Sequence, residues 1–320
     1  MNRMKKKLWV FLVTSLLLLT SCEVEVPGGG FLTATPASTG PTPTPVIIGR
    51  PEVKPTDTPM PMPPTPTPRP TFTPAPTPVV GETPEATTQP AEETTQPATD
   101  MVLIPAGPFI MGSDSDDPDE APQQEVDLPA FEIDLFEVTN AQFAAFVEAT
   151  GYQTDAQKGG EAGWRGFYTE GKDNHPVVKV SWNDAVAYCR WMGKRLPTEA
   201  EWEKAARGTD GRTYPWGNEW DAARLNSYQS GYRGTTPVGS FADGASPYGV
   251  FDMAGNVWEW TADWFLPYPG SNYQDPYFGE ENKVTRGGGW FEEPPQVRTS
   301  NRNCTSPIAA NDDLGFRCAR

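Results

Sequence analysis

Residues 101–320 are predicted to form an α+β domain in which regular secondary structure is scarce. Three segments begin with a capping box, the pattern in which a hydroxyl residue is followed three positions later by an acidic residue or a glutamine. The strand candidates are short and end at Gly, Pro, Asp or Asn. Long irregular stretches separate these elements, which argues against the regular strand–helix alternation of a parallel sheet.

The three helices are expected at 139–151, 181–193 and 198–208. Each has apolar residues at helical spacing, which predicts one buried face, and the first and third end at a glycine. The capping boxes are Thr139 with Gln142, Ser181 with Asp184, and Thr198 with Glu201. The inward faces are Phe143, Phe146 and Val147; Trp182, Ala185, Val186 and Cys189; and Trp202 and Ala206.

Five segments are predicted as strands because each is short, apolar and bounded by turn-forming residues. They cover 101–112, 129–139, 175–181, 256–265 and 283–290. Ten of the eleven tryptophans lie within 101–320, and most of them are expected to pack in the core.

The first 22 residues have the pattern of a bacterial lipoprotein signal peptide. Four basic residues within the first seven precede an apolar run over 8–19, and Leu-Thr-Ser then leads to Cys22. The run is shorter than the roughly 20 residues that a membrane-spanning helix needs. We expect lipidation at Cys22 and a domain anchored to the membrane on its extracytoplasmic side; a plain signal peptide or an uncleaved anchor is the alternative.

Residues 23–100 are expected to be a disordered stalk rich in Pro and Thr. This stretch holds 20 of the 36 prolines, in runs such as "PMPPTPTPRPTFTPAPTP". Such a composition cannot bury enough apolar surface to offset the entropy lost on ordering, and its prolines favour extended polyproline II.

The chain is strongly acidic, with a formal net charge of −17. Without the four basic residues of the signal segment, 21 basic residues face 42 acidic ones, a net of −21. Phosphate backbones repel such a chain, so nucleic acid is not expected as a partner.

Several long motifs follow one another in the domain: "HPVVKVSWNDAVAYCRWMGKRLPTEAEWEKAARG", "YPWGNEW", "GVFDMAGNVWEWTADW", "RGGGW" and "NDDLGFRC". In this order they resemble the formylglycine-generating enzyme, or sulfatase-modifying factor, family over nearly all of 101–320. The resemblance implies a fold of low regular content that is related to C-type lectins. It also implies an enzyme that oxidises a sulfatase cysteine to formylglycine with molecular oxygen and with copper held by two cysteines; other members use iron and a histidine cluster.

The chain departs from the family where the copper ligands are expected. The interval Trp290–Arg302, "WFEEPPQVRTSNR", contains no cysteine, and Cu(I) requires soft sulfur ligands. No copper is therefore expected. An iron site built from several histidines is excluded by count because His175 is the single histidine, and we interpret it as a turn or packing residue.

The resemblance implies a structural disulfide between Cys189 and Cys318. Cys304 is then left over, either buried and inert, paired with another molecule, or reactive. As a lone catalytic thiol it lacks an evident histidine base.

The resemblance also implies calcium sites built from oxygen ligands. One would use the carboxylates of Asp252 and Glu259 with the backbone carbonyls of Gly255 and Val257. A second, doubtful site falls on four residues, among which a serine replaces the expected carboxylate: Asn226, Ser227, Ser230 and Tyr232.

Three functions remain open. The favoured one is a surface-anchored module that binds an extracytoplasmic protein or peptide, or a glycan. The alternative is an oxidoreductase or protein-modifying enzyme with a different chemistry, and the third is formylglycine generation through Cys304. Candidate residues for the alternative lie in the segment that borders the family's groove, although ion pairing is the simpler interpretation of its arginines: Arg298, Ser300, Asn301 and Arg302.

Overall fold

The computed structural model describes residues 100–320. The predictions of a signal peptide, of lipidation at Cys22 and of a proline-rich stalk fall on residues outside this range. Within it, none of the helices has the length and apolar character needed to cross a membrane.

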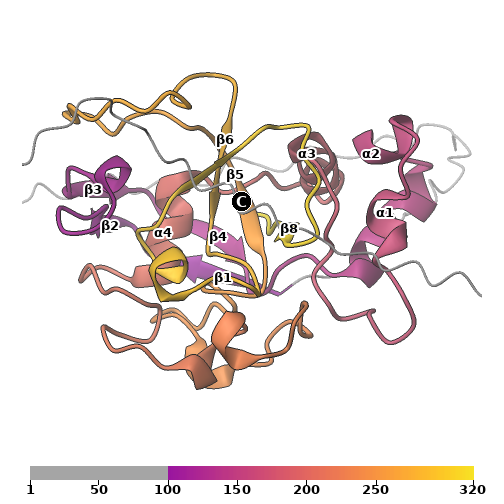
Figure 1. Ribbon diagram of the computed structural model, residues 1–320, viewed down its shortest axis with the longest axis horizontal. Helices are drawn as coiled ribbons and strands as arrows, with labels where there is room; N and C mark the ends of the chain where they lie inside the picture. Colours follow the sequence, from indigo (N-terminus) through magenta and orange to yellow (C-terminus); the bar gives the residue numbers. More distant parts are fainter. Residues whose placement is uncertain (1–99) are drawn as a thin grey trace, which may run out of the picture. The chain divides into compact units, whose positions relative to one another are not determined.

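Two small antiparallel sheets begin the domain (Figure 1). Strand β1 (Met101–Ile104) pairs with β4 (Phe131–Asp134), and β2 (Gly107–Met111) pairs with β3 (Gln124–Leu128). Ile104, in β1, is fully buried. The predicted strand over 101–112 is therefore two strands, separated by Pro105 and Ala106, that pair with different partners.

A four-stranded sheet with the order β7-β6-β5-β8 lies at the centre of the domain (Figure 1). Its strands are β5 (Trp258–Trp264), β6 (Lys283–Arg286), β7 (Asn303–Thr305) and β8 (Leu314–Gly315). Only the β5–β8 pair is parallel. The sheet thus brings the last residues of the domain beside β5, and the edge strands β7 and β8 both belong to the C-terminal segment.

The three predicted helices are confirmed as α1 (Asn140–Thr150), α3 (Trp182–Trp191) and α4 (Glu199–Arg207), each with its capping box formed. A further one-turn helix, α2 (Asp155–Lys158), was not predicted. Single turns of 3-10 helix complete the structure: Pro118–Glu120, Gly163–Gly166, Ala222–Arg224, Tyr228–Ser230, Ala242–Gly244 and Pro294–Val297.

The prediction of a strand over 175–181 is wrong. This segment makes one isolated bridge, between Thr139 and Pro176, and Lys179 has a φ of 60°, which no strand accommodates. Val177, Val178 and Val180 are nevertheless buried. The apolar residues therefore indicate that the segment is buried, although it crosses the core as irregular backbone and not as a strand.

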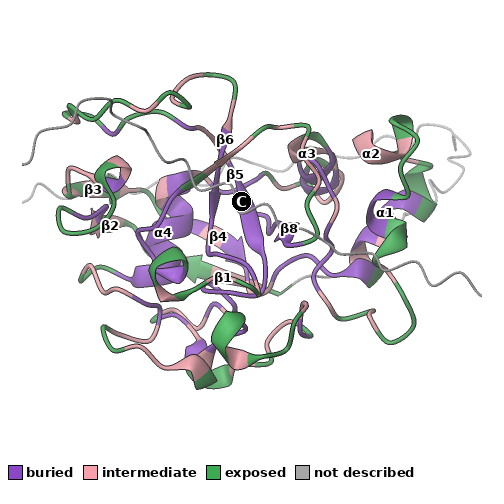
Figure 2. Cartoon of the chain, viewed as in Figure 1, coloured by how far each residue is buried: buried purple, intermediate pink, exposed green. Residues whose placement is uncertain are grey.

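Two hydrophobic clusters flank the central sheet (Figure 2). The larger one joins α1 and α3 to β5 through aromatic rings, and Phe143 packs edge-on against Trp164 with ring centroids 5.3 Å apart. The other joins α4 to β1 and β4 around Trp202, whose side chain is fully buried. None of the ten tryptophans in the described range is exposed.

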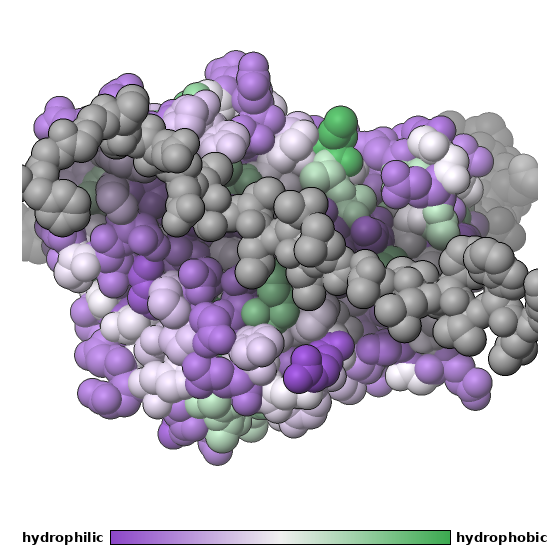
Figure 3. Space-filling model, viewed as in Figure 1, coloured by the Kyte–Doolittle hydropathy of each residue, from purple (hydrophilic) through white to green (hydrophobic). Residues whose placement is uncertain are grey.

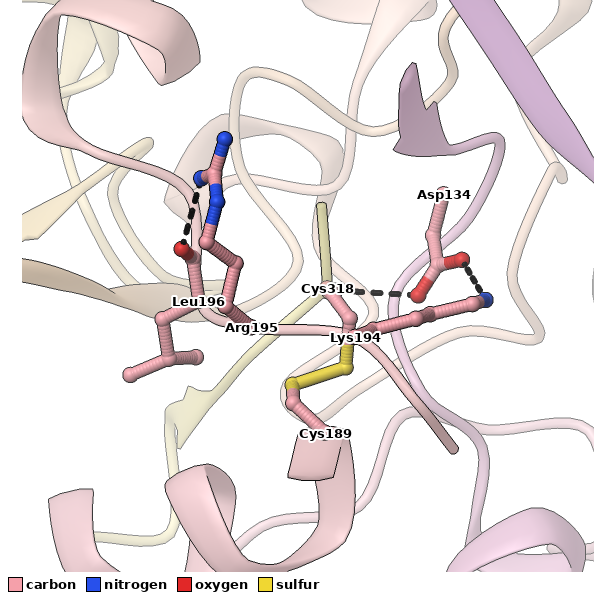
Figure 4. Close-up of a disulfide and its surroundings, with 6 residues drawn as sticks. All are labelled: Asp134, Cys189, Lys194, Arg195, Leu196 and Cys318. Atoms are coloured by element: carbon pink, nitrogen blue, oxygen red, sulfur yellow. Dashed lines mark hydrogen bonds and ion pairs between the residues drawn. A yellow bond between two sulfur atoms is a disulfide. The ribbon is translucent and has the colours of Figure 1, made fainter. Parts of the chain in front are cut away.

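The expected disulfide between Cys189 and Cys318 is present, and its Cα atoms are 5.7 Å apart (Figure 4). It ties α3 to the end of the chain within the larger cluster. Asp134 also holds the end of the chain against this part of the fold. Its carboxylate accepts a hydrogen bond from the backbone N–H of Cys318 at 2.9 Å and pairs with the Lys194 ammonium at 2.5 Å.

Candidate functional site

A cavity of about 370 Å³ opens at the edge of the central sheet. Strands β5, β7 and β8 supply one wall, and the loops before β7 and β8 supply the rest. We call it the acidic pocket because three of its lining residues are carboxylates. Its lining is Trp258, Phe291, Glu292, Asn303, Thr305, Asn311, Asp312, Asp313 and Leu314.

Asp313 is the most buried carboxylate of the acidic pocket, with 7% of its surface exposed. Burial raises its pKa to about 6, and the neighbouring charges of Asp312 and Glu292 add to the rise, whereas a backbone hydrogen bond to the carboxylate and the charge of Lys179 oppose it. The backbone carbonyl of Asp313 accepts the Trp258 N–H at 2.7 Å, which fixes the residue against β5. Within residues 100–320 no side chain hydrogen-bonds to or ion-pairs with its carboxylate.

Glu292 lies across the pocket and is held by an indole. The Trp258 Nε1–H donates to Glu292 Oε1 at 3.1 Å, and burial raises the pKa of this carboxyl group. Glu292 stands in the interval where the resemblance places the copper ligands. The site therefore offers carboxylate oxygen and aromatic surface at this position.

A second cavity of about 380 Å³ adjoins the first at Asp312, which lines both. We call it the basic pocket because Lys172 and Arg233 line it, and we call the two pockets together the groove. Trp290 lines the basic pocket and Phe291 the acidic one, and their rings meet edge-on at 5.2 Å. The pair thus has one ring in each pocket, and the basic pocket contains Asp312 beside its two basic residues.

The visible part of the surface in Figure 3 is mostly hydrophilic, and its apolar groups are small and separate. At the groove, however, two aromatic side chains reach solvent: Phe291 is 45% exposed and Phe167, in the basic pocket, is 41% exposed. Exposed aromatic side chains beside fixed charges are typical of protein recognition sites.

The four candidate residues of the 298–302 segment are buried and line neither pocket. Arg298 pairs with Glu120 at 2.9 Å, and Arg302 pairs with Glu199 at 2.7 Å. Ser300 Oγ accepts from Arg298 Nη1 at 3.3 Å, and Asn301 Nδ2 lies 3.5 Å from a Glu120 oxygen. These contacts favour the interpretation of the arginines as structural ion-pair partners.

The same network extends to β6 and α4. Arg286, fully buried, pairs with Glu203 and donates to the backbone carbonyls of the 299–301 segment. Although burial acts to raise it, Arg302 and Arg286 hold the pKa of Glu199 below its ordinary value. Each buried charge in this network therefore has an opposite charge beside it, unlike Asp313.

Cys304 is half-buried in β7 and is the free cysteine of the described range. Its strand neighbours Asn303 and Thr305 both line the acidic pocket. Because successive side chains of a strand point to opposite faces, the thiol faces away from that pocket. Burial raises the pKa of the Cys304 thiol, so it is neutral near pH 7.

His175 is half-buried at the turn before the irregular segment that crosses the core. Its Nδ1 lies 3.0 Å from Thr235 Oγ1 and 3.3 Å from Lys172 Nζ. Burial lowers the pKa of this imidazole, and Lys172 lowers it further. These contacts give the ring a packing role.

The first expected calcium set lies in a buried, acidic loop. Burial raises the pKa of Asp252 to about 6 and that of Glu137, nearby, well above its ordinary value. Glu137 Oε1 is buried without a hydrogen-bond partner, whereas Glu259 is held by Arg317 at 2.6 and 2.7 Å. Arg317 alone opposes three carboxylates, so the chemistry of this loop fits a hard cation.

Three residues of that loop also have positive φ values. Asp252, Gly255 and Asn256 have φ values of 57°, 77° and 63°. A Cβ at Gly255 would lie 2.2 Å from the Asn226 carbonyl oxygen, so only glycine fits there. In residues 100–320 no three His, Cys, Asp or Glu side chains are placed to hold a metal. A cation here would therefore need the carbonyls of Gly255 and Val257.

The second expected calcium set does not fit an ion in this arrangement. The Ser230 hydroxyl donates to the Ser227 carbonyl at 2.7 Å and lies 3.4 Å from Asn226 Oδ1, two of the oxygens that an ion would need. Tyr232 is 60% exposed. The Ser230 hydroxyl thus bonds within its own loop, where the resemblance places a carboxylate ligand. We derive no role for an ion at these residues.

Residues 86–320 match the family model of the sulfatase-modifying factor enzyme 1-like domain. The chain belongs to this family. The chain is 40% identical over 285 residues to the formylglycine-generating enzyme of Thermomonospora curvata, an alignment that covers 68% of this chain and 92% of that enzyme. It is 37% identical over 272 residues to the inactive C-alpha-formylglycine-generating enzyme 2 of Mus musculus, with coverage of 68% and 85%.

Solved structures agree with this assignment. The structure of PvdO from Pseudomonas aeruginosa superposes with a TM-score of 0.56 at 35% identity and covers 69% of this chain and 93% of PvdO. The predicted α+β fold of the formylglycine-generating-enzyme type is therefore confirmed. The sulfatase-modifying-factor family includes a relative named inactive, so membership does not decide whether this chain is an enzyme.

Proposed function

We propose that this chain is a cell-envelope lipoprotein whose sulfatase-modifying-factor-like domain binds an extracytoplasmic peptide or protein in the groove. The domain would be lipid-anchored through Cys22 and held away from the membrane by the proline-rich stalk. The observation that carries the proposal is the acidic pocket: carboxylates and aromatic rings line it, and the interval Trp290–Arg302 contains no sulfur. A Cu(I) dithiolate cannot be built from these groups.

A peptide suits the groove better than a glycan does. Every tryptophan in the described range is buried or half-buried, so the exposed aromatic surface of the groove comes from Phe167 and Phe291. The groove instead offers fixed charges of both signs at its two ends. A glycan remains the second ligand class to test.

An enzyme with another chemistry is the alternative function, and Asp313 is the observation that favours it. A carboxyl group with a pKa of about 6 beside a cavity can act as a general acid or base near neutral pH. The alternative that the acidic pocket supports is therefore proton transfer during protein modification.

A calcium ion in the Asp252 loop is part of the proposal. Asp252 and Glu259, with the carbonyls of Gly255 and Val257, would hold it. Its charge would offset the buried carboxylates, and its role would be structural because Asp252, Gly255 and Glu259 line neither pocket.

Two assays with the full-length chain in detergent test the proposed function. The first is binding to an immobilised array of random peptides and, in parallel, to a glycan array; we expect peptide binding. The second is incubation with copper(I), oxygen and a peptide containing Cys-x-Pro-x-Arg, followed by mass spectrometry. We expect no conversion of the cysteine to formylglycine, and turnover would show that the domain is a copper oxidase after all.

A further inference from the structure

We propose that the basic pocket binds a carboxylate of the bound peptide, which belongs either to an acidic side chain or to the C-terminus. This inference rests on the proposed function of the groove as a peptide site, and it names the chemical group that one of the two pockets selects.

The first argument is that the cations of the basic pocket are not neutralised within the fold. Lys172 and Arg233 line this cavity of about 380 Å³. Across residues 100–320 neither of them forms an ion pair with a carboxylate, in contrast to the arginines of the 298–302 network. Asp312 is the one carboxylate among the lining residues, so positive charges outnumber negative ones there by two to one. A group with a single negative charge would complete the balance.

The second argument is that Lys172 is held in place. It is half-buried, its ammonium Nζ lies 3.3 Å from His175 Nδ1, and its backbone carbonyl accepts a hydrogen bond from Asn140 Nδ2 at 3.0 Å. Burial and the charge of Lys172 lower the pKa of the His175 imidazole, so the ring is neutral near pH 7 and can accept a hydrogen bond from the ammonium. A side chain that is already ordered loses less entropy when it binds an anion.

The third argument is an acceptor without a donor at the wall of the same pocket. Asn140 lines the pocket and is 2% exposed. Its Nδ2 is committed to the Lys172 carbonyl, which fixes the direction of the amide, and its Oδ1 is buried without a hydrogen-bond partner. Proteins seldom leave a buried acceptor unpaired. A peptide carries a backbone N–H close to its carboxylate, and that N–H is the donor that Oδ1 lacks.

Asp312 favours a carboxylate over a phosphate. A phosphate group carries about 1.5 to 2 negative charges at pH 7, and the Asp312 carboxylate in the same pocket would repel it more strongly than it repels a single charge. The chain as a whole has a formal net charge of −17, but its distant carboxylates act weakly here because salt screens exposed charges beyond about 8 Å. The choice of anion is therefore made by the residues of the pocket.

The surface and size of the pocket suit a short piece of peptide. Trp290 and the 41% exposed Phe167 supply apolar surface to it. The Lys179 ammonium lies 5.5 Å from the centroid of the Phe167 ring, so it adds positive charge beside the pocket. The volume of about 380 Å³ is at the small end of ligand sites, which suits one or two residues and not a folded partner.

The test compares three pentapeptides that differ in one group. They are Gly-Gly-Glu-Gly-Gly with an amidated C-terminus, its counterpart with glutamine, and the glutamine peptide with a free C-terminal carboxylate. Each carries the same fluorophore at its N-terminus and is titrated against the full-length chain in detergent. Hydrogen bonds to charged groups lead us to expect that one of the two carboxylate peptides, or both, binds on the order of tenfold more tightly than the glutamine amide. The two carboxylate peptides distinguish a side chain from a C-terminus.

Variants assign the effect to the pocket. Lys172→Gln removes the charge, keeps an amide that can donate to His175, and should remove most of the preference for a carboxylate. Arg190→Gln is the matched control at an exposed residue that lines neither pocket of the groove, and it should retain the preference. Arg233→Gln changes an exposed residue and should also weaken the preference, which provides a second variant if Lys172→Gln does not fold.

The outcomes separate the two proposals. Equal binding of the three pentapeptides would overturn the inference while the groove remained a peptide site. Inorganic phosphate that binds more tightly than the glutamate peptide would overturn it in favour of a phosphate site. If only peptides on the random array bind, they should be enriched in Asp and Glu, and a lack of enrichment would overturn the inference alone. If no peptide binds in either assay, the proposed function fails together with the inference.

Discussion

Asp313 is a buried carboxylate at the wall of an open cavity. Its neighbour across the chain is Gly289, where a Cβ would lie 3.1 Å from an Asp313 oxygen. The backbone therefore closes over the carboxylate on one side, and the cavity opens on the other. Burial on the closed side raises the pKa to about 6, within reach of the pH changes met outside a cell.

Asp313→Asn should stabilise the domain at pH 7. The folded pKa of about 6 lies above the ordinary aspartate value of 3.8, so ionised Asp313 opposes folding above both values, by up to about 3 kcal/mol. Below pH 3.8 the group is protonated in both states and the effect vanishes. Urea unfolding should show the variant more stable than the parent at pH 7 and equal to it at pH 3.5. A variant that is less stable at pH 7 would mean that Asp313 has a partner in the fold.

At the scale of elements, the sequence predicts what is local. The helices α1, α3 and α4 are confirmed because a capping box and an apolar stripe lie within a dozen consecutive residues. Strands β7 and β8, with three and two residues, are too short to show a pattern. The segment 175–181 was misassigned because valines mark burial in irregular backbone as readily as in a strand.

The groove could not be predicted because its parts are remote in sequence. The "FEEPP" and "NDDLG" segments, which contain Glu292 and Asp313, are visible as acidic stretches, but nothing local indicates that they face each other across Trp258. The resemblance pointed to the segment 298–302 instead. The arginines of that segment pair with Glu120 and Glu199 and line neither pocket.

Calcium should stabilise the domain through the Asp252 loop. An ion that binds only the folded state adds about 2.7 kcal/mol at a hundred times its Kd, which corresponds to a rise in Tm of about 5 to 10 °C. Scanning calorimetry with calcium and with a chelator measures this. Asp252→Asn should reduce the rise, and Asp243→Asn should leave it unchanged. A Tm that is the same in calcium and chelator would remove calcium from the proposal.

At the scale of the whole domain, the end of the chain holds the parts together. Strand β8 pairs in parallel with β5, Arg317 reaches Glu259, and the backbone of Ala319 pairs with Arg195. The backbone of Arg320 exchanges two hydrogen bonds with Glu132 of β4, at 2.9 and 2.7 Å. The C-terminal segment thus contacts both hydrophobic clusters, and it also supplies Asp313 to the acidic pocket.

Removing the disulfide should destabilise the domain. The bond joins residues 129 positions apart, and closing a loop of that length in the unfolded chain is worth about 4 to 5 kcal/mol. The double variant Cys189→Ser/Cys318→Ser should lose about that much in urea unfolding, with the slope changed because its unfolded state is more expanded. Cys304→Ser is the matched control, since its thiol is free, and it should unfold like the parent. A double variant as stable as the parent would show that these hydrogen bonds, and not the covalent bond, hold the end of the chain.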